Sequence, residues 1–215
     1  MYDKCTEWQP SQPHQVKVAS KIAFVLGNGK SRLQVDHTKL VGFGSIYGCN
    51  ALYREFSPDY LVAVDPRMVK EISRTNYQLT NTVYTNHSRS YDNITGLNYL
   101  EPMRGWSSGP SAIWLAAQHK HNEIYLIGFD FIGINGKVNN VYANTPNYKR
   151  DNEEEIFYKN WVKQIQIILR EYSKTKFLRV GTVDSYVPTE FKNFRNYHHY
   201  DITKFCNFFE PKPTV

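Results

Sequence analysis

The composition is that of a basic chain with enough apolar residues for one full hydrophobic core. The chain has 215 residues, of which 41% are hydrophobic, and a formal net charge of +6 at pH 7, which suits a single domain. Cysteine occurs only at positions 5, 49 and 206, without a Cys-x-x-Cys pair, so neither a disulfide framework nor a zinc motif is indicated. The positive charge fits an anionic partner such as a nucleotide, a phosphorylated glycan or nucleic acid, and it also fits an ordinary basic surface.

The first residues of the chain are polar and interrupted by proline, as in "MYDKCTEWQPSQPHQ". They lack the basic, apolar and small-residue order of a signal peptide, and the chain has no run of 18 apolar residues of the kind that crosses a membrane. We expect residues 1–20 to be loosely ordered and the protein to be cytoplasmic.

Short apolar runs bounded by Gly, Pro, Asn or Asp predict six strands. In chain order they are residues 22–26, 44–47, 60–64, 82–85, 123–127 and 177–183. Two short helices are predicted between them, at residues 66–73 and 110–119, and the second has proline in its first turn, where proline is favoured. The longest predicted helix covers residues 151–172, because its apolar residues keep a 3.6 period and Asp151 and Glu154 have capping-box spacing.

Strands that alternate with helices are typical of an α/β fold. The order predicts a doubly wound, mostly parallel sheet flanked by helices, in one domain over residues 21–185. Residues 186–215 include the aromatic stretch "NYHHYDITKFCNFFEP", and we expect them to form a C-terminal extension that packs on this domain as a cover over the sheet.

The stretch "KIAFVLGNGKSR" is similar to two phosphate-binding motifs and satisfies neither. A P-loop needs glycine where Phe24 stands, and a dinucleotide fingerprint needs a third glycine where Arg32 stands, so close packing of a helix on the strand is not expected there. What both motifs share is a strand that turns at glycines, here Gly27 and Gly29, and presents backbone N–H groups to an anion. The stretch therefore predicts either a nucleotide-binding turn or an ordinary tight turn.

Polar side chains follow four of the predicted strands, namely Asn28, Asn50, Asp65 and Asp130. The carboxyl ends of parallel strands meet at one edge of a sheet, where ligands bind. Asparagine donates and accepts hydrogen bonds, as recognition of a base edge or a ribose requires, and a carboxylate accepts from ribose hydroxyls. Each residue alone is more often a turn former, but together they favour a binding site.

The sequence "GWSSGPSAIW" places Ser107, Ser108 and Gly109 at the start of a predicted helix. Hydroxyl groups and a free N–H at the positive end of a helix dipole can hold a phosphate or a carboxylate. The same serines can instead simply cap the helix, and the sequence leaves both interpretations open.

In order and spacing, "FVLGNGKS", "IYGCNALY", "LVAVDP" and "SSGPSAIWLAAQHKHNEIYLIGFDF" resemble the bacterial sialyltransferases of glycosyltransferase family 42. More distantly, they resemble the hydroxymethylpterin pyrophosphokinase-like proteins of the same superfamily. The resemblance runs from about residue 21 to about residue 183 and is weakest over residues 71–104. It implies a Rossmann-like fold and a transferase that uses a cytidine monophosphate (CMP) sugar donor as substrate, without a metal or other cofactor.

Carried over by position, the resemblance implies roles for individual residues. Asp65 stands where the family commonly has asparagine, so this contact with the donor is expected to differ. Tyr142 falls near a family tyrosine that contacts the leaving phosphate, and Tyr142 and Tyr148 are the candidate catalytic residues, whereas Ile132 replaces the tyrosine expected after "GFDF". The implied donor contacts are Asn28, Asn50, Asp65, Ser107, Ser108 and Gly109, to which the turn itself adds Gly27 and Gly29.

The family also uses a histidine shortly before its last long helix as the base that deprotonates the acceptor hydroxyl, a role suited to imidazole. Here no histidine occurs between His121 and His198. If the fold brings them to the site, the residues that can substitute are Tyr148, Tyr158, Glu153, Glu154, His198 and His199.

The first prediction is therefore a sialyltransferase-like glycosyltransferase that moves a sugar, with sialic acid from a CMP donor as one option, to a hydroxyl acceptor such as a glycan. The alternatives are a non-catalytic nucleotide-binding module and a pyrophosphoryl transferase, whose Mg²⁺ would need acidic ligands such as Asp65 and Asp130. Nucleic acid as a partner rests on charge and aromatic content alone, because no recognised motif accompanies them. The resemblance also allows a homo-oligomer.

Overall fold

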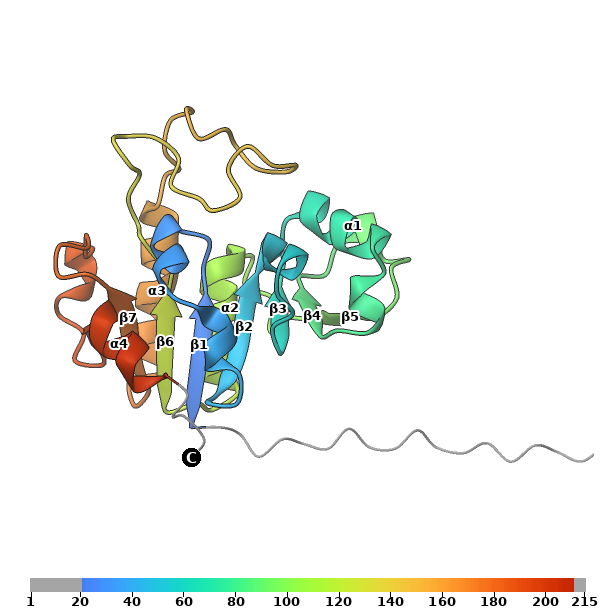
Figure 1. The fold of residues 1–215 in the computed structure, drawn as a ribbon. Coiled ribbons are helices and arrows are strands. Elements are labelled where there is room, and N and C mark those ends of the chain that lie inside the picture. Colours follow the sequence, from blue (N-terminus) through green and yellow to red (C-terminus); the bar gives the residue numbers. More distant parts are fainter. Residues whose placement is uncertain (1–20, 211–215) are drawn as a thin grey trace, which may run out of the picture.

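The computed structural model describes residues 21–210, which form a three-layer α/β fold around one sheet (Figure 1). The sheet has eight parallel strands in the order β5-β4-β3-β2-β1-β6-β7-β8. This confirms the predicted fold class. The strands are β1 (Ile22–Leu26), β2 (Ser45–Cys49), β3 (Tyr60–Val62), β4 (Val83–Thr85), β5 (Leu97–Tyr99), β6 (Glu123–Ile127), β7 (Lys176–Gly181) and β8 (Tyr197–Asp201).

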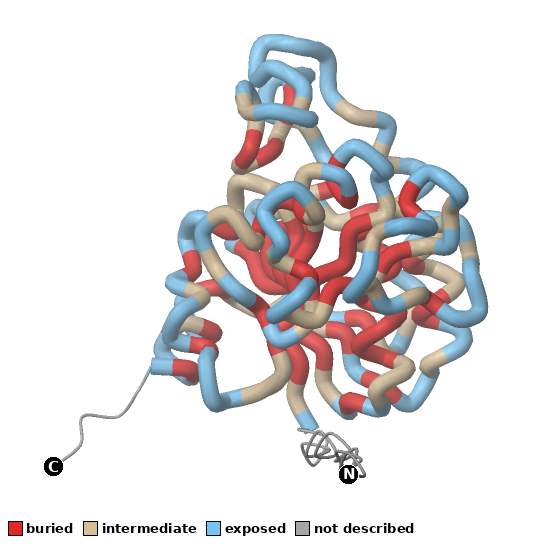
Figure 2. The backbone as a smooth tube through the Cα atoms, turned by 90° about the vertical axis from the view of Figure 1, so that its right-hand side faces the viewer, coloured by how far each residue is buried: buried red, intermediate tan, exposed pale blue. Residues whose placement is uncertain are grey.

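Helices cover both faces of the sheet and enclose two apolar cores. One core lies beneath α2 (Ser108–Gln118) and α3 (Lys159–Glu171), and the other beneath α1 (Pro66–Arg74) and α4 (Ile202–Phe208). Buried strands run through the middle of the molecule, with exposed loops around them (Figure 2). Strands buried on both faces read as continuous apolar runs, which is why the sequence identifies β1 and β6 so clearly.

The centre of the sheet contains the point at which the direction of winding reverses. The chain builds outward from β1 to β5 on one side, then returns to place β6 on the other side of β1. In such sheets, ligands bind beyond the carboxyl ends of the strands beside this point. A ligand-binding site is therefore expected to centre on the loops after β1 and β6.

The two edge strands, β5 and β8, were not predicted. Their sequences, "LNY" and "YHHYD", have no apolar run because an edge strand is partly exposed. Their identity as strands comes from pairing with β4 and β7, which the local sequence does not reveal.

The predicted start of the longest helix, at residue 151, is wrong, because α3 begins at Lys159. Two of the acidic residues before it, Glu153 and Glu155, bind loop backbone instead of the helix terminus. The carboxylate of Glu153 accepts the N–H of Arg150 at 2.6 Å, and that of Glu155 accepts the N–H of Gly133 at 2.5 Å. The apparent capping box therefore belongs to the loop that crosses from β6 to α3.

The aromatic C-terminal region contributes to the sheet and also covers it. Strand β8 extends the sheet at its edge, and α4 places Phe205 and Phe209 on the adjoining face. The ring of Phe209 lies 4.9 Å from Phe24 and that of Phe205 lies 5.3 Å from Tyr125, measured between centroids. Residues 1–20, expected to be loosely ordered, and residues 211–215 of the extension lie outside the described residues.

Between residues 21 and 210, no helix is both long enough and apolar enough to cross a membrane. A cytoplasmic location stays a prediction from the sequence.

A buried cluster near the start of β6 makes stability depend on pH. The hydroxyl of Tyr47 lies 2.7 Å from Nδ1 of His119 and 2.9 Å from Nε2 of His121. Burial, and then the charge of His121, lower the pKa of His119 from its ordinary value of 6.5. The unfolded chain therefore binds a proton at His119 more readily than the folded chain does. This contribution to stability is complete above about pH 6.5 and is lost as the pH falls through the folded-state pKa.

We expect the free energy of unfolding, measured with urea, to fall between about pH 7.5 and about pH 5.5. His119→Gln should make this decline shallower. His198→Gln, on the exposed edge strand β8, is the control for loss of a histidine and should leave the slope as it is. An undiminished slope in His119→Gln would show that this cluster does not couple protonation to folding.

Candidate active site

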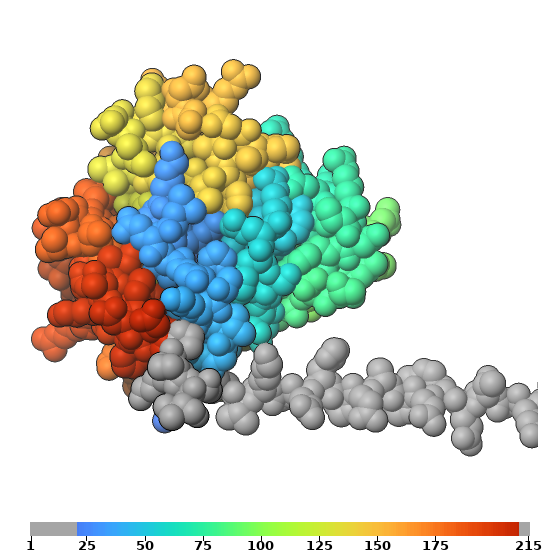
Figure 3. All heavy atoms as spheres, viewed as in Figure 1, coloured from blue at the N-terminus to red at the C-terminus, as the bar shows by residue number. Residues whose placement is uncertain are grey.

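A cavity of about 590 Å³ lies at the carboxyl ends of the strands. The segment of residues 128–158 arches over this end of the sheet (Figure 1), and in Figure 3 its yellow atoms lie above and behind the blue atoms of the first part of the chain. The structure brings all eight sequence-predicted donor-contact residues to the wall of this cavity: Gly27, Asn28, Gly29, Asn50, Asp65, Ser107, Ser108 and Gly109.

The glycines of the first loop serve close packing between loops. The N–H of Gly27 donates to the carbonyl of Ile127 at 2.7 Å, and that of Gly29 donates to the carbonyl of Gly128 at 2.9 Å. The end of β6 and the loop after it therefore supply acceptors for the N–H groups of these two glycines. A Cβ atom on Gly27 would lie only 2.6 Å from the Gly128 oxygen, so glycine is required by the approach of two backbones.

From the sequence, Arg32 was notable only because it stands where a dinucleotide fingerprint has its third glycine. In the structure, its side chain stabilises the first loop. Its side chain is 1% exposed and forms an ion pair of 2.6 Å with Glu55. Its guanidinium also donates to the carbonyl of Gly27 at 3.3 Å and lies 3.5 Å from Oδ1 of Asn28. The Asn28 amide is thus oriented by a buried cation, and the local sequence carried no signal for this because the partner Glu55 is distant in the chain.

Ser108 connects the second and third loops of the cavity. Its hydroxyl donates to Oδ1 of Asn50 at 2.7 Å and accepts the N–H of Val64 at 3.1 Å. Asn50 itself has φ of +53°, a conformation that asparagine tolerates better than most residues. Ser107 is the N-cap residue of α2 and makes no capping hydrogen bond with its side chain, whereas the Ser108 hydroxyl bonds to two other loops.

Two carboxylates border the cavity and have different structural partners. Asp65 caps α1, accepting the N–H of Arg67 at 2.8 Å. Asp130 accepts the N–H of Ser31 at 3.2 Å, the Ser31 hydroxyl, and Nδ2 of Asn139 at 2.9 Å. Asp130 therefore joins the first loop to the segment that arches over the cavity.

Of the two predicted catalytic tyrosines, only Tyr148 borders the cavity. Its hydroxyl oxygen accepts hydrogen bonds from Nδ2 of Asn28 at 3.2 Å and from the N–H of Ala51 at 3.3 Å. Burial raises the pKa of Tyr148, so the phenol keeps its proton at neutral pH. That proton is not needed for either of these two bonds, and it is therefore free to be donated to a ligand oxygen.

Tyr142 packs against Tyr148, with 5.4 Å between the ring centroids, and is 6% exposed. Its hydroxyl donates to Glu55 at 2.5 Å and accepts from Arg32 at 3.0 Å. Tyr142 is therefore a buried residue that stabilises the site without lining the cavity.

The residues expected to replace the family's histidine are only partly brought to the cavity. Tyr158 borders it, but burial, followed by the charges of Glu155 and Asp130, raises its pKa to about 12, so its phenol keeps its proton at neutral pH and is not available as a base. His198 and His199 lie on the edge strand β8. Neither these histidines nor Glu153 and Glu154 line the cavity.

Within the described range 21–210, no three side chains of His, Cys, Asp or Glu gather closely enough to hold a metal ion.

The chain matches no protein-family model and no curated protein. Its fold is similar to that of the monofunctional α-2,3-sialyltransferase Cst-I from Campylobacter jejuni, with 14% sequence identity over 87% of this chain and 85% of that chain and a TM-score of 0.59. It is also similar to the sialyltransferase CstII from Campylobacter jejuni, solved with the substrate analogue cytidine-5'-monophosphate, with 16% identity over 76% of this chain and 81% of that chain and a TM-score of 0.50. At these identities the likeness is one of architecture: the chain has a sialyltransferase-like α/β fold.

Proposed function

We propose that this protein is a sialyltransferase-like glycosyltransferase that transfers a sugar from a CMP-linked donor to a hydroxyl acceptor such as a glycan. The observation that carries the proposal is the convergence of Asn28, Asn50 and the serines of α2 on one cavity beside the reversal point of the sheet. The CMP complex of CstII, a protein with a similar fold, supports the choice of nucleotide.

The cavity offers the groups that this chemistry needs. The amides of Asn28 and Asn50 supply donors and acceptors for a pyrimidine edge or ribose hydroxyls. Tyr148, which keeps its proton, would donate to a phosphate oxygen as negative charge develops on the leaving nucleotide. Trp106 and Trp161 also line the cavity and offer apolar ring surfaces on which a base or a sugar ring can stack.

Calorimetric titration with CMP tests the proposal, with uridine diphosphate and adenosine triphosphate as comparison ligands and each titration run with and without Mg²⁺. Cytidine-selective binding that does not require the metal is the expected result. Binding only with Mg²⁺ would favour pyrophosphoryl transfer, and no binding of any nucleotide would contradict the proposal.

The double variant Asn28→Ala with Asn50→Gly should abolish hydrolysis of a CMP-sugar donor and weaken CMP binding by about 30-fold or more, since each lost hydrogen bond contributes about 1 kcal/mol. Glycine is chosen at position 50 because φ there is +53°, which glycine adopts without strain. Asn193→Ala, at an exposed position of the loop before β8, is the control. Full activity in the double variant would exclude this assignment of the site.

A non-catalytic nucleotide-binding module is the second candidate. It is favoured by one observation, that no histidine is among the residues lining the cavity. Such a module would bind CMP with measurable affinity and turn over no CMP-sugar donor, so binding and hydrolysis measured on the same preparation separate the two functions.

A further inference from the structure

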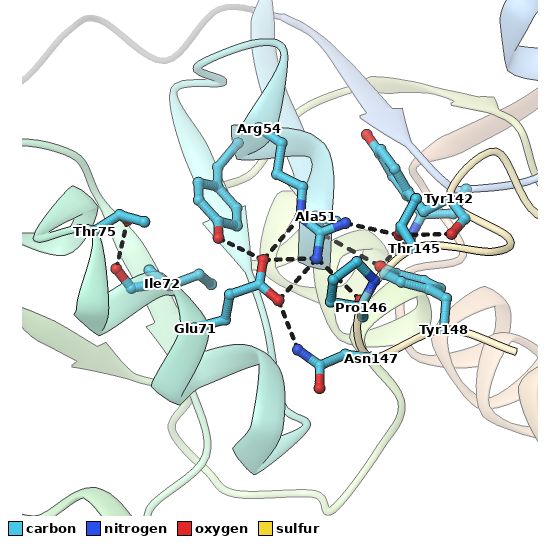
Figure 4. A network of polar contacts seen from close by, with 12 residues as sticks. Ala51, Arg54, Glu71, Ile72, Thr75, Tyr142, Thr145, Pro146, Asn147 and Tyr148 are labelled. Carbon is cyan, nitrogen blue, oxygen red and sulfur yellow. Dashed lines mark hydrogen bonds and ion pairs between the residues drawn. The ribbon is translucent and has the colours of Figure 1, made fainter.

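An ion pair outside the cavity contacts the segment that carries Tyr148 (Figure 4). Arg54 is the last residue of the 3₁₀ turn Asn50–Arg54, which begins at the cavity residue Asn50, and Glu71 lies on α1. Neither residue lines the cavity. Their contacts nevertheless lead directly to it.

The two side chains meet in a two-point geometry. Nε of Arg54 donates to Oε1 of Glu71 at 2.8 Å, and Nη2 donates to Oε2 at 2.8 Å. Their side chains are only 23% and 20% exposed. Burial alone would raise the pKa of Glu71, but hydrogen bonds from Tyr53, Arg54 and Asn147 outweigh it and hold this pKa below its ordinary value. A bidentate pair fixes the plane of the guanidinium in a way that lysine cannot reproduce.

Both members of the pair also hold the segment before Tyr148. Nη1 of Arg54 donates to the hydroxyl of Thr145 at 2.8 Å, and Nη2 donates to the carbonyl of Pro146 at 3.0 Å. Nδ2 of Asn147 donates to Oε2 of Glu71 at 2.6 Å. Three consecutive residues of the segment are thus bonded to one pair. An ion pair that is fully exposed contributes little by itself, but this one is largely shielded from water and also bonds to a segment that reaches the cavity.

The next residue in the chain is Tyr148, whose N–H donates to the carbonyl of Thr145 at 3.1 Å. The Arg54 guanidinium lies 5.9 Å from the centroid of the Tyr148 ring. At the other end of this ring, the hydroxyl accepts from Asn28 and from Ala51, in the first and second loops. The Arg54–Glu71 pair is therefore connected, through residues 145–147, to a tyrosine whose hydroxyl contacts both loops.

We propose that Arg54 and Glu71 are positioning residues that hold the Tyr148 hydroxyl across the first and second loops of the nucleotide site. The proposal rests on the proposed function, because it assigns Tyr148 a role in binding the nucleotide phosphate.

The test is a double-mutant cycle on CMP affinity, combined with amide exchange in the protein without nucleotide. Arg54→Lys and Tyr148→Phe should each weaken CMP binding by about 10-fold, the loss of about one charge-assisted hydrogen bond. The double variant should bind no more weakly than Tyr148→Phe alone, because Arg54 acts through Tyr148. Arg74→Lys, an exposed position on the same helix as Glu71, is the control and should match the unmodified protein.

The Ala51 N–H reports on the same contact without any ligand, since it donates to the Tyr148 hydroxyl. Its hydrogen exchange, followed by NMR, should accelerate in Arg54→Lys as it does in Tyr148→Phe. Glu71→Gln, which keeps the size and one carbonyl oxygen of the side chain, should give the same acceleration and guards against a variant that fails to fold.

The outcomes separate this proposal from the proposed function. If the unmodified protein binds no CMP, the proposed function fails, and the Ala51 exchange rate still decides whether the pair positions Tyr148. If CMP binds but the losses in the cycle add, or if exchange at Ala51 is unchanged in Arg54→Lys and Glu71→Gln, Arg54 acts independently of Tyr148 and the positioning role is overturned.

Discussion

Replacing Gly27 by alanine is expected to lower the free energy of unfolding by about 3 kcal/mol, the upper end of what overpacking costs, and to abolish nucleotide binding. The new Cβ atom would lie 2.6 Å from the carbonyl oxygen of Gly128 and 3.1 Å from the ring of Phe129. The first of these neighbours is backbone, and the N–H of Gly27 is bonded to Ile127 at 2.7 Å. Because β1 and β6 are central strands, neither can shift without disturbing its other neighbour.

Gly42→Ala is the matched control for the Gly27 variant. Gly42 has φ of +91°, and a Cβ atom added there would have open space around it, with no contact within 4 Å beyond its chain neighbours. Alanine at this position therefore meets only backbone strain of about 1–2 kcal/mol. Urea unfolding and CMP titration of both variants make the comparison. A Gly27 variant as stable as the Gly42 variant would mean that the two loops do not approach each other as described.

Glu55→Ala should lower the free energy of unfolding by about 2–3 kcal/mol and also weaken nucleotide binding. The Arg32 side chain is 1% exposed and would be left without its carboxylate partner, while the Tyr142 hydroxyl would lose its acceptor. Breaking a fully buried pair costs about 3–5 kcal/mol. The expected value is smaller because the Glu55 side chain is 43% exposed, which lets water replace part of the interaction.

Two further variants provide comparisons for the loss of stability expected in Glu55→Ala. Glu55→Gln keeps an oxygen acceptor for Arg32 and should lie between the unmodified protein and the alanine variant. Lys39→Ala removes an ion pair with Glu210 whose side chains are 45% and 61% exposed, and it should cost less than about 1 kcal/mol. If denaturant unfolding gives Glu55→Ala the same small loss as Lys39→Ala, the Arg32 network is not a support of the site.

The sequence predicted the parts of the fold whose signal is local. Strands β1 and β6 were found at their observed bounds, because β1 is apolar throughout, β6 is apolar after Glu123, and glycine follows each of them. The edge strands β5 and β8 carry polar residues, and pairing with a neighbour defines them. The start of α3 was misplaced because acids such as Glu155 bond to loop backbone, a contact that spacing along the chain does not indicate.

For the site, residues that follow strands were predictable and residues that support them were not. Parallel topology alone brings Asn28, Asn50 and Asp65 to one cavity. Arg32 and Arg54 could not be assigned from the sequence, because the roles of both depend on partners in the segment that arches over the cavity, such as Tyr142 and Thr145. The structural role of such an arginine depends on which hydrogen-bond acceptors the fold places beside it.

The covering segment of residues 128–158 is attached to the first loop by further hydrogen bonds besides those of Asp130. The N–H of Val141 donates to the carbonyl of Asn28 at 2.8 Å, and the N–H of Lys30 donates to Oδ1 of Asn139 at 2.9 Å. At this corner of the cavity we therefore expect the covering segment and the first loop to move together. We expect a ligand to enter and leave past the part of the covering segment that lies beyond these attachments, so that access to the cavity can change while the first loop keeps its arrangement.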